Sequence, residues 1–192
     1  MKSRRNDIIE KSMKLFNKEG YQSPSIDRIS ENAGISKMTF YRYFPDKESL
    51  ITEILKEKHH QFISDIKSIT EKYPTAKEKL FSIFQYYEKW FCCDEFHGCM
   101  FTRAVFEYGS LSPSLIEISS IFKSHLCSLI RDVLLMILKP EPAERVAFMI
   151  VLLIDGAIAA SQTETPESQE FPPAMTAWSA AKAIIYSEGG SF

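Results

Sequence analysis

The sequence lacks the short motifs that mark the common classes of enzyme. It contains no glycine-rich phosphate loop, no serine elbow with histidine and aspartate partners, and no histidine pair at metal-binding spacing. His59 and His60 are adjacent, so on a helix they point to different sides. We therefore expect a protein that is not an enzyme and that carries neither a cofactor nor a metal.

An apolar leader and a long hydrophobic run are also missing. Met1 is followed by charged residues and then by an amphipathic pattern, which is unlike a signal peptide. The longest apolar run, from Val146 to Ala160, is interrupted by Asp155 and is shorter than the ~20 residues that a bilayer requires. We expect a cytoplasmic protein with no membrane partner.

Cysteine is sparse, and its spacing does not indicate a known site. In a reducing cytosol Cys92, Cys93, Cys99 and Cys127 are expected to be thiols. His97 lies between Cys93 and Cys99, which leaves a zinc or redox site open, but the spacing matches none of the usual pairs. We favour buried thiols that pack as small hydrophobic side chains.

Net charge is small, at −2, but the two signs are unevenly distributed. Residues 1–50 hold ten lysines and arginines against seven acidic residues, whereas the remainder holds thirteen against eighteen. A positive N-terminal part would face phosphates, and the acidic remainder would point away from them. Lys2, Arg4 and Arg5 suggest either a flexible DNA-binding arm or, as we favour, an ordinary solvated terminus.

Two short helices joined by a glycine turn are predicted between Ser25 and Leu50. Ile29 and Ala33 belong to the apolar face of the first helix, and Gly34 tolerates the positive φ that ends it. Ser36 is then placed to cap the second helix. This pattern is typical of a helix-turn-helix that reads DNA, although such corners also occur in all-helical cores.

The second of these helices has an inward side and an outward side. Phe40 and Phe44 lie four residues apart and are expected to pack inward, and Pro45 halts the helix. Lysine and arginine neutralise phosphates or read guanine edges, while hydroxyl groups bond phosphate oxygens. Alternatively, the outward tyrosines cover a core edge. The candidate DNA-contacting residues are Ser25, Ser36, Lys37, Met38, Thr39, Tyr41, Arg42, Tyr43 and Lys47.

From Ile8 to Leu50 the sequence resembles the N-terminal domain of the TetR family of bacterial transcriptional regulators. The similarity lies in the stretch IIEKSMKLFNKEGY, then in Ser25–Ser36, Thr39–Phe44 and Lys47–Leu50. In this family the third helix enters the major groove, so the resemblance implies the same role here.

Residue roles follow from the same resemblance. It implies that Lys37 and Thr39 approach bases, and that Tyr41, Tyr43 and Lys47 contact phosphates. Two positions depart from the family pattern, because Met38 replaces a residue that is often small and Pro24 stands where threonine is common. The base preference of relatives therefore does not transfer.

The remaining sequence continues as helices with short loops and no convincing strand, which predicts an all-α bundle of about nine helices. We expect a DNA-binding domain over residues 1–46 and a helical effector-binding and dimerisation domain over residues 47–192. The expected later helices cover residues 47–70, 76–93, 100–108, 114–138, 143–163 and a last one from Pro173 to before Gly189, with a polar loop from Thr163 to Glu170.

Aromatic residues crowd the region from Phe81 to Tyr108, and most are expected to be ordinary core. Arg103 and Glu107 lie four apart and can pair with each other on one helix. The family resemblance implies a small, largely apolar effector bound between the central helices. Its proposed lining residues are Phe62, Phe84, Tyr87, Phe101, Arg103 and His125.

The last two helices are apolar over broad faces and carry several small residues. In the family this helix pair forms a four-helix bundle with a second copy, so the resemblance implies a homodimer. An internal hairpin is the alternative, and Asp155 must face water, pair or shift its pKa. The expected dimer residues are Val146, Met149, Ile150, Leu153, Ala157, Trp178, Ala181 and Ile185.

Together these observations predict an effector-responsive regulator, released as a repressor from a palindromic double-stranded DNA operator. A helical adaptor that binds protein without binding DNA is the alternative.

Overall fold

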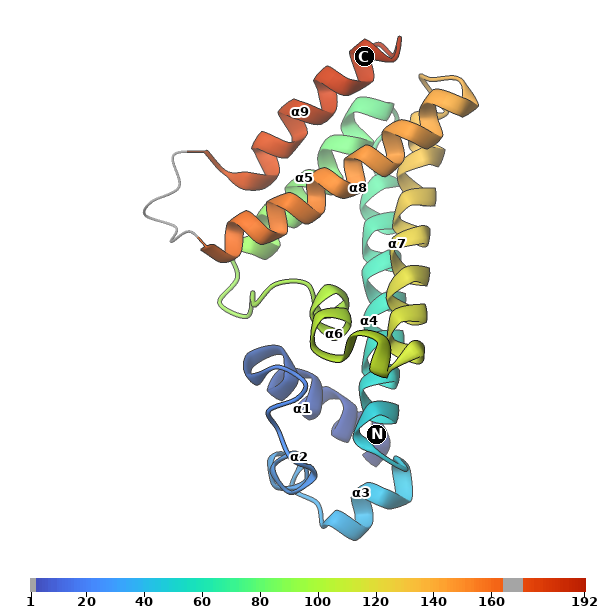
Figure 1. The fold of residues 1–192 in the computed structure, drawn as a ribbon. Helices are drawn as coiled ribbons and strands as arrows, with labels where there is room; N and C mark the ends of the chain where they lie inside the picture. Colours follow the sequence, from blue (N-terminus) through green and yellow to red (C-terminus); the bar gives the residue numbers. More distant parts are fainter. Residues whose placement is uncertain (1–2, 164–170) are drawn as a thin grey trace. The chain divides into compact units, whose positions relative to one another are not determined.

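The computed structural model describes residues 3–163 and 171–192, and within these ranges the chain is helical and has no strand (Figure 1). The predicted all-α class is confirmed. The predicted loop after Thr163 falls outside the described residues. The described helices are α1 (Arg4–Glu19), α2 (Ile26–Ala33), α3 (Lys37–Tyr43), α4 (Lys47–Thr70), α5 (Ala76–Phe91), α6 (Met100–Tyr108), the 3-10 helix η1 (Gly109–Leu111), α7 (Pro113–Leu134), α8 (Pro140–Thr163) and α9 (Pro173–Ser187).

The chain forms two compact units that differ from the predicted domains. One unit contains the residues up to His60 together with Cys99–Ile121, and the other contains Gln61–Gly98 together with Phe122–Phe192. The long helices α4 and α7 each contribute one part to each unit. Helix α6 therefore belongs to the unit that holds the helix-turn-helix, although the sequence interpretation had assigned it to the second domain.

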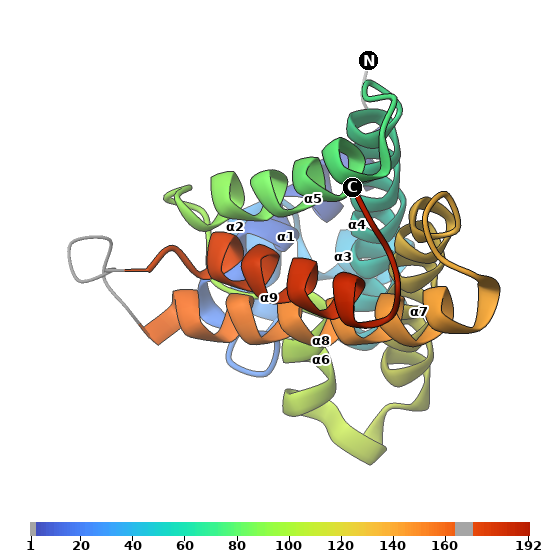
Figure 2. The ribbon, with the colours of Figure 1, turned by 90° about the horizontal axis from the view of Figure 1, so that it is seen from above.

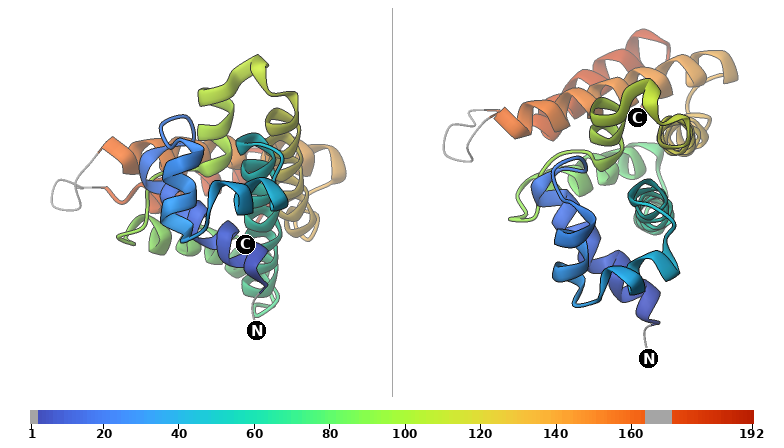
Figure 3. Two further views of the ribbon diagram at one scale, coloured as in Figure 1. Left: turned by 90° about the horizontal axis from the view of Figure 1, so that it is seen from below. Right: turned by 60° about the horizontal axis from the view of Figure 1, so that its bottom comes forward.

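Local signals define the first three helices, which Figure 3 shows from below in blue. Ser3 caps α1, and Gly20 ends it with a φ of 82°. Gly34 ends α2 with a φ of 69°, in the left-handed region that favours glycine, and its N–H bonds to the carbonyls of Ser30 and Glu31. The core of this unit includes Ile8, Ile9, Phe16, Tyr21, Ile29, Phe40, Phe44, Leu50, Ile51 and Ile54, all 0–1% exposed.

Helices α5, α8 and α9 pack together in the second unit (Figure 2). A capping box between Thr75 and Glu78 starts α5. The Trp178 ring on α9 lies 5.4 Å from that of Phe84 on α5, centre to centre. The buried residues of α8 and α9 include Val146, Ile150, Ile154, Ala157, Ala177, Trp178, Ala181 and Ile185.

Helix α8 extends beyond the apolar run from Val146 to Ala160, since it begins at Pro140 and ends at Thr163. Among the described helices it is the one that is long and apolar enough to cross a membrane, judged by length and composition. Helices of bundle cores and of subunit interfaces pass the same test, so this property is weak support for a membrane span.

Candidate nucleic-acid interface

Helix α3 starts at a side-chain cap and turns two phenylalanines inward. The Ser36 hydroxyl accepts a hydrogen bond from the Thr39 N–H at 3.1 Å. Phe40 and Phe44 are 0% and 1% exposed, and their ring centres lie 5.9 Å apart. Because both rings lie on one side of the helix, the residues between them project from the other side.

The outward side of α3 is open to solvent. Met38 is 82% exposed and Tyr41 is 48% exposed. Lys37 and Arg42 are also exposed, and the Arg42 guanidinium lies 5.2 Å from the ring centre of the half-buried Tyr43. Two cations, a phenol and a flexible thioether on one short helix suit contacts to phosphates and base edges.

Ser25 and Thr39 take part in the helix-turn-helix itself. Ser25 is exposed, and its hydroxyl accepts the Arg28 N–H at 3.2 Å, so it caps α2. Thr39 is half-buried, and its Oγ1 lies 3.0 Å from the Oγ of Ser36. Thr39 therefore has less free surface than a base-contacting role assumes.

Lys37 forms an ion pair across the helix-turn-helix. Its Nζ lies 3.0 Å from Oδ1 of Asp27, and it donates to Oδ2 at 3.3 Å. The hydrogen bond from Lys37 to this carboxylate raises the pKa of the lysine, and the charge of Asp27 adds to the effect. Asp27 lies in the first turn of α2, so the pair joins the N-terminal ends of two helices.

Lys47 binds the turn that precedes α2. Its Nζ donates to the carbonyl oxygens of Gln22 at 3.0 Å and Pro24 at 3.2 Å. Burial lowers the pKa of Lys47, and the nearby Glu107 carboxylate partly opposes this effect. These two hydrogen bonds form because the turn between α1 and α2 presents carbonyls within reach of the start of α4.

Glu107 of α6 binds the corner between α1 and α2. Its Oε2 accepts the backbone N–H groups of Tyr21 and Gln22, both at 2.8 Å. The side-chain amide of Gln22 also donates to the Glu107 carbonyl. Gly20, with a φ of 82°, has no room for a Cβ, which would lie 2.8 Å from the Glu107 carboxylate.

Arg103, one turn earlier on α6, binds the end of α1. Its guanidinium donates to the Asn17 carbonyl at 2.7 Å and to the Phe16 carbonyl at 3.4 Å. The Arg103 Nε also lies 4.0 Å from the Glu107 Oε1, as the spacing predicts. In addition to this pair, each side chain binds backbone groups near the end of α1. Arginine at a helix C-terminus satisfies free carbonyls and the helix dipole. Arg103 therefore belongs to the helix-turn-helix unit and stabilises the end of α1.

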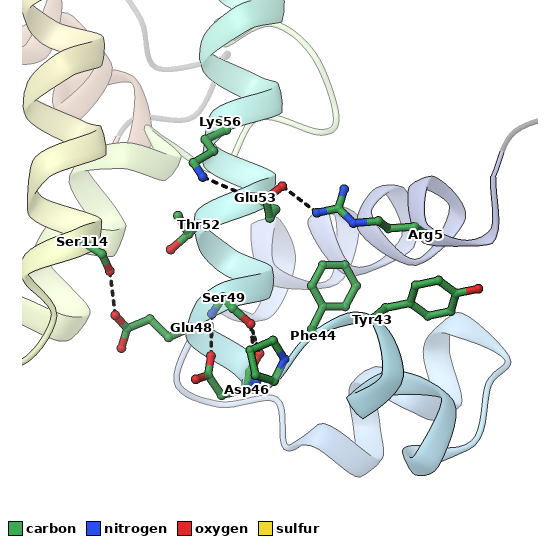
Figure 4. Close-up of a pocket in the computed structure, with 11 residues that line it drawn as sticks. Arg5, Tyr43, Phe44, Asp46, Glu48, Ser49, Thr52, Glu53, Lys56 and Ser114 are labelled. Atoms are coloured by element: carbon green, nitrogen blue, oxygen red, sulfur yellow. Dashed lines mark hydrogen bonds and ion pairs between the residues drawn. The ribbon is translucent and has the colours of Figure 1, made fainter.

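A pocket of about 510 Å³ opens beside α3 and the start of α4 (Figure 4). Three of its charged groups are paired with one another, because Glu53 accepts from Arg5 at 2.6 Å and from Lys56 at 2.9 Å. Of the residues considered for an N-terminal arm, Arg4 and Arg5 belong to α1, and Lys2 lies outside the described residues. The lining also includes Tyr43, Phe44, Pro45, Asp46, Glu48, Ser49, Thr52 and Ser114.

Two of the predicted effector residues share one aromatic cluster in the second unit. Phe62 is half-buried, and its ring centre lies 5.5 Å from those of Tyr87 and Phe122. Neighbouring Tyr86 donates to Asp65 at 3.3 Å, and burial raises its pKa to about 12, with the Asp65 carboxylate adding to the effect.

The other predicted effector residues are not in this cluster. Phe84 packs on Trp178 between α5 and α9. His125 is exposed on α7, so its polarity needs no ligand to explain it. Phe101 is buried, and like Arg103 it belongs to the helix-turn-helix unit. Helical spacing alone did not reveal which side of each helix faces its neighbours.

Most of the predicted dimer residues are already buried inside one chain. Met149 remains 37% exposed and Leu153 is half-buried, but the others have no surface to offer a second copy. The reason is that α9 and α5 cover this side of α8. The predicted residues that are buried in this way are Val146, Ile150, Ala157, Trp178, Ala181 and Ile185, each at most 6% exposed.

A different side of α8 is apolar and open. Phe148 is 59% exposed and Leu152 is 54% exposed, and both lie near Met149 at helical spacing. A Cβ added at Gly156, one turn further on, would meet nothing within 4 Å. Asp155, the charge within the apolar run, pairs with Lys123 of α7.

The prediction of buried thiols is wrong. Cys92 and Cys93 are exposed, and Cys99 and Cys127 are half-buried. The α5 helix ends at Phe91, two residues earlier than predicted, which leaves the first two thiols in a turn. Among the described residues, no three histidine, cysteine or acidic side chains converge as metal ligands.

The fold and the α3 surface define a helical protein with an N-terminal helix-turn-helix. Comparison with known families matches residues 8–54 to the bacterial regulatory proteins of the tetR family. The predicted resemblance to the TetR family is thereby confirmed over these residues, which make up about a quarter of the chain.

Curated relatives share a limited part of the sequence. The chain is 34% identical over 73 residues to the fatty acid metabolism regulator protein of Bacillus subtilis, a match that covers 38% of each chain. It is 39% identical over 72 residues to an uncharacterised HTH-type transcriptional regulator of the same organism, covering 38% of this chain and 25% of the relative. The chain therefore matches well under half the length of these relatives.

Solved structures share the fold over nearly the whole chain. A TetR-family transcriptional regulator from Streptomyces coelicolor superposes with a TM-score of 0.87 at 21% identity, covering 96% of this chain and 95% of that one. A TetR transcriptional regulator from Chloroflexus aurantiacus gives a TM-score of 0.81 at 19% identity, with coverages of 96% and 95%. Both are named as transcriptional regulators, and at this level of identity the likeness shows a shared fold.

Proposed function

We propose that this protein is a homodimeric repressor that binds a palindromic DNA operator and is released from it by a small, largely apolar effector. The observation that carries the proposal is the outward face of α3, where Lys37, Met38, Tyr41 and Arg42 are exposed above two buried phenylalanines. A core-packing corner would turn such side chains inward, whereas here they stay open to solvent, including Lys37 in its exposed pair with Asp27. We place its action in the cytoplasm, where chromosomal DNA is accessible.

In this proposal α3 lies in the major groove. Lys37 and Met38, at the start of the helix, read base edges, with the thioether suited to a thymine methyl group. Tyr41, Arg42 and the capping hydroxyl of Ser25 contact the phosphate backbone. Two copies would read half-sites about one helical turn, ~34 Å, apart.

The open side of α8 supports dimerisation. Phe148, Met149 and Leu152 form an exposed apolar stripe, and Gly156 lets a second helix approach closely. Exposed apolar patches of this kind mark protein interfaces. A two-fold dimer would bury the same stripe from both copies, because a two-fold interface is self-complementary.

The aromatic cluster around Phe62 is the effector site that we propose. Phe62 is half-buried and is contacted by Tyr87, Trp90 and Phe122 at centre-to-centre distances of 5.5–6.1 Å. Such a cluster presents apolar faces, with the Tyr86 hydroxyl as one polar group. Because one relative is named as a fatty acid metabolism regulator, fatty acids are the first compounds to test.

Helix α6 provides the means by which an effector would move the DNA-binding helices. Arg103 holds the end of α1, and Glu107 holds the amides of Tyr21 and Gln22. A shift of α6 therefore changes the position of the α1–α2 corner. For an effector to use this path, it must bind the two positions of α6 with different affinity.

Selection from random duplex DNA tests the proposal directly. We expect recovery of an inverted repeat, and binding whose affinity falls steeply with salt because phosphate contacts release counterions. Replacing both Tyr41 and Arg42 by alanine should weaken binding to all duplexes, whereas Met38→Ala should change base preference without unfolding the protein. Salt-independent binding or none would instead favour the protein-binding adaptor.

A further inference from the structure

The Lys37–Asp27 ion pair occupies a place where DNA phosphate is expected to bind. Asp27 lies in the first turn of α2, directly after the Ser25 cap, and Lys37 is the first residue of α3. The N-terminus of a helix attracts anions, because its free N–H groups and its dipole are positive. The Asp27 carboxylate therefore already interacts with the α2 dipole and with the Lys37 ammonium group. An incoming phosphate would use the same two interactions.

The pair is exposed enough to exchange. The side chains of Lys37 and Asp27 are 52% and 73% exposed, so water and DNA reach both groups. Exposed ion pairs shift an equilibrium by at most about five-fold. Such a contact is strong enough to weaken indiscriminate binding, and weak enough to be broken when a matching base edge is present.

We propose that Asp27 is a specificity-determining residue that competes with DNA phosphates for Lys37. On DNA of unrelated sequence, Lys37 gains only a phosphate contact. Because Lys37 must break its ion pair with Asp27 to make that contact, most of the binding free energy gained is cancelled. On a matching site, Lys37 gains an oriented bond to a base edge, which exceeds the pair that it gives up. Asp27 thus weakens binding to unrelated DNA more than binding to a matching site, which widens the ratio of the two affinities. This inference rests on the proposed DNA-binding function.

The test uses the full-length protein with Asp27→Asn and two labelled duplexes. One duplex is a 30-base-pair pool of random sequence, and the other is a single sequence recovered by selection with the wild-type protein. Dissociation constants are measured by fluorescence anisotropy over a series of salt concentrations. We expect the variant to bind the random pool about two- to five-fold more tightly. The ratio of the two affinities should fall, and the salt slope on the pool should steepen by up to about 0.9.

Two controls separate this effect from a change in net charge. Glu31→Gln removes the same charge from α2, but Glu31 is paired with Arg28 at 3.6 Å rather than with Lys37. Its effect on the random pool should be smaller. In a Lys37→Met background, Asp27→Asn should no longer tighten binding, because the cation that it releases is absent.

The outcomes distinguish this inference from the proposed function. If wild-type protein binds neither duplex in a salt-dependent way, the DNA-binding function falls and the role of Asp27 falls with it. If wild-type protein binds DNA but Asp27→Asn matches Glu31→Gln, or acts equally in the Lys37→Met background, only the role of Asp27 is overturned. Weaker binding of Asp27→Asn to both duplexes overturns it as well.

Discussion

Glu107 accepts the backbone N–H of Tyr21 at 2.8 Å, although the two residues are 86 positions apart in the sequence. The same carboxylate oxygen accepts the N–H of Gln22, and Arg103 binds the carbonyls at the end of α1. Helix α6 thus holds both sides of the α1–α2 corner, with an acceptor for its amides and a donor for its carbonyls.

Replacing Glu107 by alanine should destabilise the helix-turn-helix unit. Two backbone amides lose their acceptor, and one buried unsatisfied polar group typically costs about 1–3 kcal/mol. We expect the free energy of unfolding in urea to fall by about that amount, and hydrogen exchange at Tyr21 and Gln22 to accelerate. Glu57→Ala, an exposed change on α4, should stay within about 0.5 kcal/mol of wild type. Equal effects of the two changes would contradict the role of Glu107.

Replacing Leu152 by glutamate should convert a dimer into monomers. Leu152 is 54% exposed on α8, and a charge there would be buried without a partner in the proposed two-fold interface. Sedimentation equilibrium should give the mass of one chain, 22.1 kDa, in place of twice that value. Leu135→Glu, at a 43% exposed leucine in the turn after α7, should leave the dimer intact. A Leu152→Glu protein that remains dimeric would place the interface elsewhere.

Replacing Ser12 by alanine should stabilise the protein. Ser12 is fully buried in α1, and among the described residues its hydroxyl has no hydrogen-bond partner. Alanine removes the unsatisfied group and has a higher helix propensity, so the free energy of unfolding should rise by up to about 1 kcal/mol. Ser82→Ala is the matched control, because the equally buried Ser82 donates to the Lys79 carbonyl at 2.7 Å. A loss of stability at Ser12 would indicate a partner for its hydroxyl.

The ion pairs of Glu53 should make stability depend on pH in the acidic range. Hydrogen bonds from Lys56 and Arg5 hold the pKa of Glu53 below its ordinary value of 4.5. Because the folded pKa is the lower one, this contribution is fully present above pH 4.5 and is lost as the pH falls through the folded pKa. Urea unfolding of wild type and Glu53→Gln should therefore differ most at neutral pH and converge on acidification. A difference that grows toward low pH would have the wrong sign.

The positions of α1, α2 and α3 could be predicted from the sequence because the signals that define them are local. Ser25 and Ser36 cap helices, and Gly34 supplies the left-handed residue between them. Phe40 and Phe44 lie at helical spacing and are buried together, which decides the outward side of α3. Each of these relationships spans fewer than ten residues, so neighbouring side chains and backbone geometry suffice to determine it.

The partners of the charged residues were decided by the tertiary structure. Lys47 meets the carbonyls of Gln22 and Pro24, and Arg103 meets those at the end of α1. An ammonium or guanidinium group binds whichever acceptors the fold brings near, and these acceptors lie far away in the sequence. Spacing along one helix cannot reveal them.

The same reason explains why the sequence did not indicate which side of α8 is buried within one chain. Helix α8 is apolar on several sides, so its sequence indicates burial without saying whether α9 of the same chain or a second copy provides it. The sequence by itself determined the resemblance of residues 8–54 to the TetR family, the all-α class and the outward side of α3, through local caps, turns and periodicity. The packing of α5, α8 and α9 decided that Val146 and Ile150 face inward while Phe148 and Leu152 stay open, because only contacts between distant segments select one side of an apolar helix.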